Sequence, residues 1–171
     1  MDRDDAWGRE EAEAVYPRLM KAIQQAAGAD IIRISAEGVQ RTDASFPRET
    51  VFAVALRHRG TKVFCVTNLA SESIADNWDM AGQKMGQGIV WWKNGSYQFL
   101  GPAPSQVMMQ LFDLAIEAKE GLSTASAAKK LKKELTNVST LLKQLTDKGY
   151  MVRRETISPT GGKEFRYFAA T

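Results

Sequence analysis

The first hundred residues show two hydrophobic periods, one typical of helices and one of strands. Apolar positions three and four apart predict helices over 10–27, 47–59 and 71–84, and Pro17 interrupts or begins the first of them. Short apolar runs rich in β-branched residues predict strands over 31–35 and 62–68. These elements predict strands flanked by helices.

Two further strands, over 89–92 and 96–100, surround Asn94-Gly95, which is a strong signal for a tight hairpin. From the first strand onward the predicted order is β-α-β-α-β-β, a small mixed α/β-layer arrangement. Trp91 and Trp92 are neighbours on a strand and must point to opposite faces. We expect one to fill the core and the other to meet a helix, a ligand or a partner.

A Pro- and Gly-containing stretch, 101–105, separates this region from the rest of the chain. Neither Pro102 nor Pro104 fits the interior of a helix or a central strand. The sequence therefore predicts two domains, 1–101 and 102–171.

Helical periodicity returns after Ser105, a good N-cap residue. It predicts a helix to about 118–120, a second helix over 125–131 capped by Ser123 or Thr124, and a third that opens near 135–136. The segment 132–134 separates the last two, and Gly149 ends the third. Strands over 150–156 and 163–169, joined by a Pro- and Gly-containing turn, complete an α+β arrangement.

Three helices followed by a basic hairpin are typical of a winged helix. The segments 123–131 and 137–150, followed by Arg153-Arg154 and Gly161-Gly162-Lys163, resemble the MarR-like winged helix-turn-helix regulators. The resemblance implies a DNA-binding domain over 102–171, in which the third helix enters the major groove and the hairpin contacts phosphates or the minor groove. The expected DNA-binding residues are Thr136, Asn137, Ser139, Thr140, Lys143, Arg153, Arg154, Lys163 and Arg166.

The segment 38–46, followed by a helix and the strand 63–68, resembles a STAS-type domain. In that family a phosphorylatable Ser or Thr follows an aspartate at the start of the helix. Here Ala44 follows Asp43, and Ser45 comes one position later. We therefore expect Ser45 to cap the helix.

The charge distribution supports a polyanion partner for the second half. The chain carries a net charge of +3, but residues 102–171 carry +4 and residues 1–101 carry −1. A basic excess on one domain is typical of nucleic-acid binding, and a solvated helix face explains it as well. A winged helix that binds protein is a further alternative.

Other chemistry has little support in the sequence. The single cysteine, Cys65, and the single histidine, His58, cannot complete a four-ligand zinc site, so we expect no metal. Gly86-Gln87-Gly88 lacks the context of a nucleotide-binding loop. We expect His58 on the surface at a helix end, and Asp76 and Asp79 in solvent. Without a nucleophile and base, we predict no enzymatic activity and no cofactor.

The sequence favours a cytoplasmic, two-domain transcriptional regulator with double-stranded DNA as its partner. The chain has no apolar run of membrane-spanning length, and its charged first residues are unlike a secretory signal. A homodimer is expected because one such helix buries too little surface for operator-level specificity. A regulatory protein is a further candidate partner of the first domain. The alternative is a signalling adaptor whose two domains bind only proteins.

Overall fold

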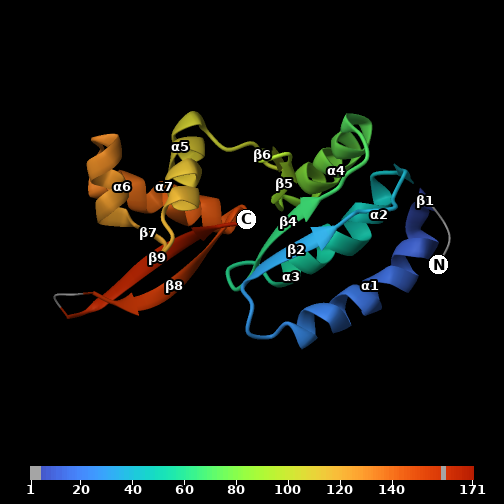
Figure 1. The fold of residues 1–171 in the computed structure, drawn as a ribbon, viewed down its shortest axis with the longest axis horizontal. Helices are drawn as coiled ribbons and strands as arrows, with labels where there is room; N and C mark the ends of the chain where they lie inside the picture. Colours follow the sequence, from blue (N-terminus) through green and yellow to red (C-terminus); the bar gives the residue numbers. More distant parts are fainter. Residues whose placement is uncertain (1–4, 159–160) are drawn as a thin grey trace.

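The computed structural model describes residues 5–158 and 161–171, with side chains described from Trp7 onward (Figure 1). The chain is of mixed α/β class and contains a four-stranded and a three-stranded sheet, each with its own helices. We call residues 5–101 the N-terminal part and residues 102–171 the C-terminal part. No helix in the described ranges is long and apolar enough to cross a membrane.

The four-stranded sheet consists of β2 (Ile31–Ser35), β4 (Val63–Thr67), β5 (Ile89–Lys93) and β6 (Ser96–Leu100), in that order. The first three strands are parallel, and β6 returns antiparallel to β5. Asn94 and Gly95 both have positive φ, at 50° and 81°, as a two-residue type I′ hairpin requires. The strands and helices predicted between residues 31 and 100 are present in the predicted order, with the short strand β3 added after β2.

The helices of the N-terminal part cover one face of this sheet. They are α1 (Gly8–Gln25), α4 (Glu72–Met85) and a helical run made of α2 (Ser45–Pro47), η1 (Arg48–Phe52, a π-helix) and α3 (Ala53–Arg57). Phe52, Trp78 and Ile23 from these helices form one apolar core with Phe64 and Trp91 of the sheet.

Three details of the N-terminal part differ from the sequence prediction. Helix α1 continues through Pro17, because the carbonyl of Glu13 that loses its partner lies on the exposed side of the helix, where water can satisfy it. The run predicted from residue 47 begins at Ser45 and contains a π-helical turn. A short parallel pair, β1 (Asp5–Ala6) with β3 (Arg41–Thr42), had no sequence signal because each strand has only two residues.

The C-terminal part contains helices α5 (Gln106–Glu117), α6 (Thr124–Leu131) and α7 (Leu135–Asp147). Strands β8 (Met151–Ile157) and β9 (Lys163–Ala169) form the predicted hairpin; positions 159 and 160 of its turn lie outside the described residues. The Ser105 and Ser123 hydroxyls accept from the N–H groups of Met108 and Ser126, which confirms both as N-caps. The two-residue strand β7 (Leu122–Ser123), which pairs with β9, was missed.

The C-terminal part packs against part of the second face of the four-stranded sheet (Figure 1). Val63, Cys65 and Val90 of the sheet share one apolar core with Phe112 and Tyr150. We call this cluster the shared core. The boundary predicted at residues 101 and 102 stays a prediction, and the two parts on either side of it meet through the shared core and a few hydrogen bonds.

Trp92 shows how the shared core is closed. Trp91 is buried against the helices, as expected for one of the two tryptophans, whereas Trp92 faces the C-terminal part. The Trp92 Nε1–H donates to the carbonyl of Ala170 at 2.8 Å. The prediction that the two tryptophans serve opposite faces is confirmed, and the partner of Trp92 is the end of the chain.

Two glycines allow the end of α7 to approach the N-terminal part. A Cβ at Gly88 would overlap the ring of Tyr150, and a Cβ at Gly149 would overlap the side chain of Gln87. The Gly88 N–H donates to the carbonyl of Lys148 at 2.6 Å across this contact. The orientation of α7 is thus fixed by direct backbone contact with the α4–β5 connection.

Candidate nucleic-acid interface

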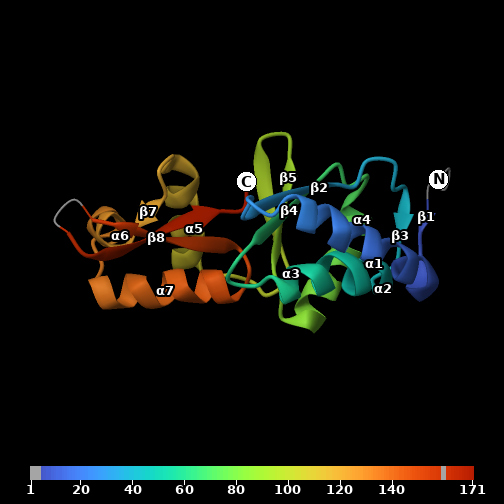
Figure 2. The same cartoon turned by 90° about the horizontal axis from the view of Figure 1, so that it is seen from below.

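Helix α7 presents a continuous polar face to solvent. Val138, Leu142 and Leu145 are fully buried on its inner side. The five residues predicted on its outer side are all exposed: Thr136, Asn137, Ser139, Thr140 and Lys143. In Figure 2 this helix forms the lower side of the C-terminal part. Because its inner side is held by packing, the outer side is free to meet a partner without any rearrangement.

The polar groups of this face differ in what they can offer. Thr140 Oγ1 donates its hydrogen to the carbonyl of Thr136 at 3.0 Å, which leaves its oxygen as an acceptor toward solvent. Asn137 carries both a donor and an acceptor and has no partner among the described residues. Asn137 is therefore the side chain on α7 best suited to a two-point contact with a base edge.

Two lysines that the sequence did not single out stand at the start of α7. Lys132 caps the end of α6 in the left-handed conformation, at φ 52°, and Lys133 follows it. Both are exposed, and neither forms an ion pair with a described carboxylate. Their signal in the sequence is the run of lysines at 129, 130, 132 and 133, which indicates a basic surface at this turn.

The four cations predicted on the hairpin have different environments. Arg153 is exposed and its guanidinium lies 4.5 Å from the ring centre of Phe165, without a carboxylate partner in the described chain. Lys163 is exposed and pairs with Glu155 at 2.8 Å. Arg166 is half-buried, donates to the carbonyl of Gly121 at 3.5 Å and pairs with Glu164. Only Arg153 combines exposure with an uncompensated charge.

Arg154 is held by the N-terminal part. Its Nε and Nη2 donate to the two carboxylate oxygens of Asp30 at 2.5 Å each, and its guanidinium stacks 4.0 Å from the ring centre of Phe168. The hydrogen bond from Arg154 lowers the pKa of Asp30, although partial burial opposes this shift. The charge of Arg154 is therefore compensated within the molecule, unlike that of its neighbour Arg153.

Asp43, rather than Ser45, caps the helical run of the N-terminal part. The carboxylate of Asp43 accepts from the N–H groups of Phe46 and Gly8, both at 3.1 Å, while the Ser45 hydroxyl donates to the same carboxylate. Burial alone would raise the pKa of Asp43, but these hydrogen bonds lower it. The expectation that Ser45 is the cap is wrong, because Ser45 is already the first residue of the helix and its hydroxyl donates to Asp43, whose carboxylate accepts from the amide of Phe46.

His58 and Asp79 are also less exposed than expected. His58 is half-buried at the end of α3 and its Nε2 is buried without a partner, so burial, together with Lys62 and Arg57, lowers its pKa. Asp79 accepts from the Gly101 N–H at 2.8 Å and so holds the connection between the two parts. His58 lies at the helix end as predicted, and both side chains are partly rather than fully exposed, because contacts distant in sequence cover part of them.

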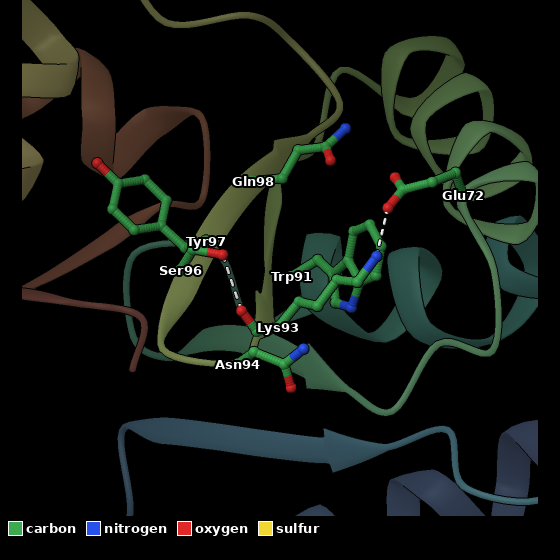
Figure 3. Close-up of a pocket in the computed structure, with 7 residues that line it drawn as sticks. All are labelled: Glu72, Trp91, Lys93, Asn94, Ser96, Tyr97 and Gln98. Atoms are coloured by element: carbon green, nitrogen blue, oxygen red, sulfur yellow. Dashed lines mark hydrogen bonds and ion pairs between the residues drawn. The ribbon is translucent and has the colours of Figure 1, made fainter.

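A polar hollow of about 350 Å³ lies between the β5–β6 hairpin and the start of α4 (Figure 3). Lys93 occupies its centre, pairs with Glu72 at 2.5 Å and lies 5.0 Å from the ring centre of Trp91. Figure 3 shows Gln98 beside this pair and Tyr97 turned to the opposite side of the hairpin. Since Lys93 and Glu72 neutralise one another, the hollow offers no net charge to a ligand.

Neither a metal site among the described residues nor a related protein points to a function. Among residues 5–158 and 161–171 no group of three or more His, Cys, Asp or Glu side chains could hold a metal ion. Comparisons with family models, with curated proteins and with solved structures find no match to this chain. The function must therefore be argued from the residues and contacts described above.

Proposed function

We propose that this protein is a transcriptional regulator that binds duplex DNA through its C-terminal part, which acts as a MarR-like winged helix-turn-helix. Helices α6 and α7 would form the helix-turn-helix, and β8 and β9 the wing. The observation that carries the proposal is the free polar face of α7, whose first turn is flanked by the uncompensated charges of Lys132 and Lys133.

The dimensions and chemistry of α7 suit the major groove. An α-helix with its side chains is about 10–12 Å across, close to the roughly 12 Å width of that groove in B-DNA. Asn137 can donate to and accept from an adenine edge at the same time. Thr136, Ser139 and Thr140 supply further hydroxyls along the same side.

Phosphate contacts would come from the cations that lack an internal partner. These are Lys132, Lys133 and Lys143 around α7 and Arg153 on the hairpin. Lys163 and Arg166 would have to loosen their bonds to Glu155 and Glu164 first. Such contacts position the protein on DNA without selecting sequence.

The N-terminal part would serve as the regulatory or protein-interaction domain, as its resemblance to STAS-type domains implies. Its charged groups support a structural role rather than catalysis: Asp43, Asp79 and Lys93 are each bonded to another part of the fold. We therefore propose no enzymatic activity. A homodimer would place two α7 helices on two half-sites.

The proposal is tested by selecting bound fragments from random duplex DNA and measuring affinity at several salt concentrations. We expect a selected sequence, and a salt slope of about 0.9 log units per phosphate contact. Absence of duplex binding would leave a protein-binding adaptor as the function.

A substitution in α7 makes this test specific. Asn137→Ala should weaken binding to the selected duplex by about 1–3 kcal/mol and leave binding to random duplex nearly unchanged. Gln144→Ala, also exposed on α7 but never predicted to contact a base, is the matched control. Equal loss on both duplexes would show that Asn137 does not contact bases.

A further inference from the structure

Four basic residues gather where three helices end. Arg57 lies in the last turn of α3, Lys84 in the last turn of α4, Lys148 at the C-cap of α7, and Arg59 just beyond α3. Two contacts bring these helix ends together: Arg59 Nη2 donates to the carbonyl of Gly86 at 2.6 Å, and the Gly88 N–H donates to the carbonyl of Lys148. We call these four residues the helix-end cluster.

The helix ends that carry these four residues lie on the same side of the molecule as α7. Figure 2 shows α3, the end of α4 and α7 along the lower side, with α7 running toward the other two. The tight contact of Gln87 and Gly88 with Gly149 fixes this arrangement. A polyanion that lies on the outer face of α7 and extends past its C-terminal end therefore meets the N-terminal part here.

The cluster carries positive charge that the protein itself does not neutralise. Arg57 and Lys84 are exposed, and none of the four forms an ion pair with a described carboxylate. The Arg59 guanidinium donates only to neutral oxygens, Oε1 of Gln87 at 2.7 Å and the carbonyl of Gly86. Asp147, exposed in the last turn of α7, is the acidic neighbour in the sequence.

Helix dipoles explain part of this charge, but not all of it. Cations are favoured at helix C-termini, where each dipole is equivalent to about half a negative charge. The C-terminal ends of three helices together are thus equivalent to about one and a half negative charges. The four basic side chains carry four positive charges, which is more than the helix dipoles balance. Even with Asp147 included, a positive surplus remains, and it adjoins the helix proposed to enter the groove.

We propose that the helix-end cluster binds the phosphate backbone of the same duplex, outside the base pairs contacted by α7. The N-terminal part then contributes directly to DNA affinity, in addition to any regulatory role. This inference rests on the proposed function. It commits to DNA phosphates as the ligand because the surface is continuous with α7 and provides guanidinium and ammonium groups without an aromatic platform for unstacked bases.

The experiment compares long and short duplexes with the full-length chain. The double variant Arg57→Ala/Lys84→Ala changes two exposed side chains, and its thermal unfolding should match that of the unsubstituted protein. On a selected duplex of about 40 base pairs we expect the salt slope to fall by close to two units, since each lost phosphate contact accounts for about 0.9. On a duplex trimmed to the selected site we expect little change, and sequence preference should be unaffected.

A control variant distinguishes the loss of a phosphate contact from a general change in the net charge of the protein. Arg9→Ala/Lys21→Ala removes the same amount of charge from two exposed side chains of α1, away from α7, and should leave the slope nearly unchanged. Of the two, Arg9 forms a long ion pair with Glu49, at 4.0 Å. Equal slopes for the two double variants on the long duplex would overturn the inference, as would an equal loss on the trimmed duplex. The inference would also be overturned if the full-length protein bound single-stranded RNA more tightly than the long duplex and the Arg57→Ala/Lys84→Ala variant lost that preference. If the unsubstituted protein binds no duplex, the proposed function itself fails.

Discussion

Arg153 and Arg154 are neighbours on one strand, yet their guanidinium groups have different surroundings. Arg153 points to solvent over Phe165 and has no carboxylate partner among the described residues, whereas Arg154 is bonded through two nitrogens to Asp30. The same contrast recurs within the N-terminal part. Asp43, Asp79, Lys93 and Lys62 are bonded to other elements, whereas Arg57 and Lys84 are exposed at helix ends without a described carboxylate partner.

The difference between paired and unpaired charged groups indicates where a partner can bind with the smallest loss of internal interactions. A charged group already paired must lose that pair before it can serve a ligand, so its contribution to binding is reduced. An exposed, unpaired group next to a rigid helix loses only water and counterions. The unpaired cations of the C-terminal part are for this reason better candidates for DNA contact than the paired ones.

The largest expected effect comes from breaking the shared core. Phe112 is fully buried between Tyr97 and Phe99, and Phe112→Ala should lower the free energy of unfolding by about 3–5 kcal/mol. All four tryptophans lie in the N-terminal part, and of these Trp92 contacts the shared core, so the fluorescence reports mainly on the part that was not changed. We expect the fluorescence and circular dichroism transitions to shift together in urea. A fluorescence midpoint that stays in place would show that the two parts unfold independently.

A smaller effect is expected from removing each arginine in turn. Arg153→Ala should reduce the salt slope of DNA binding by about one unit, as for a lost phosphate contact. Arg154→Ala should reduce it by less, because Asp30 already neutralises this guanidinium. Fluorescence anisotropy on one duplex at several salt concentrations measures both. A larger effect at Arg154 than at Arg153 would mean that DNA displaces Asp30.

The smallest effect concerns the Asp30–Arg154 pair and pH. Its contribution to stability should be below about 1 kcal/mol, because both side chains are partly solvated. The pKa of Asp30 is lowered in the folded state, so this contribution is present above the unfolded pKa of about 3.9 and is lost as the pH falls through the folded value. Urea unfolding of the unsubstituted protein and of Asp30→Asn should therefore differ at pH 6 and converge once the pH has fallen below the lowered pKa of Asp30. A difference that persists in acid would contradict an ionic contribution.

The sequence by itself determined the local elements and which residues of α7 face outward. Hydrophobic periodicity placed β2 at residues 31–35, and Asn94-Gly95 placed the hairpin, since both signals involve residues a few positions apart. Ser105 and Ser123 could be recognised as caps for the same reason. The exposed positions of Asn137 and Thr140 followed from the 3.6-residue period of a helix packed on one side.

Tertiary structure decided which of the charged groups remain free. Asp30 and Arg154 are 124 residues apart, and no local pattern predicts that they pair. The same holds for the burial of His58 and for the meeting of α3, α4 and α7 at the helix-end cluster. Strand β7 exists only because β9 lies beside it. The hydrophobic pattern of a helix or strand depends on residues that are close in the sequence. Whether a charged side chain finds an opposite charge depends on which surfaces the completed fold brings together.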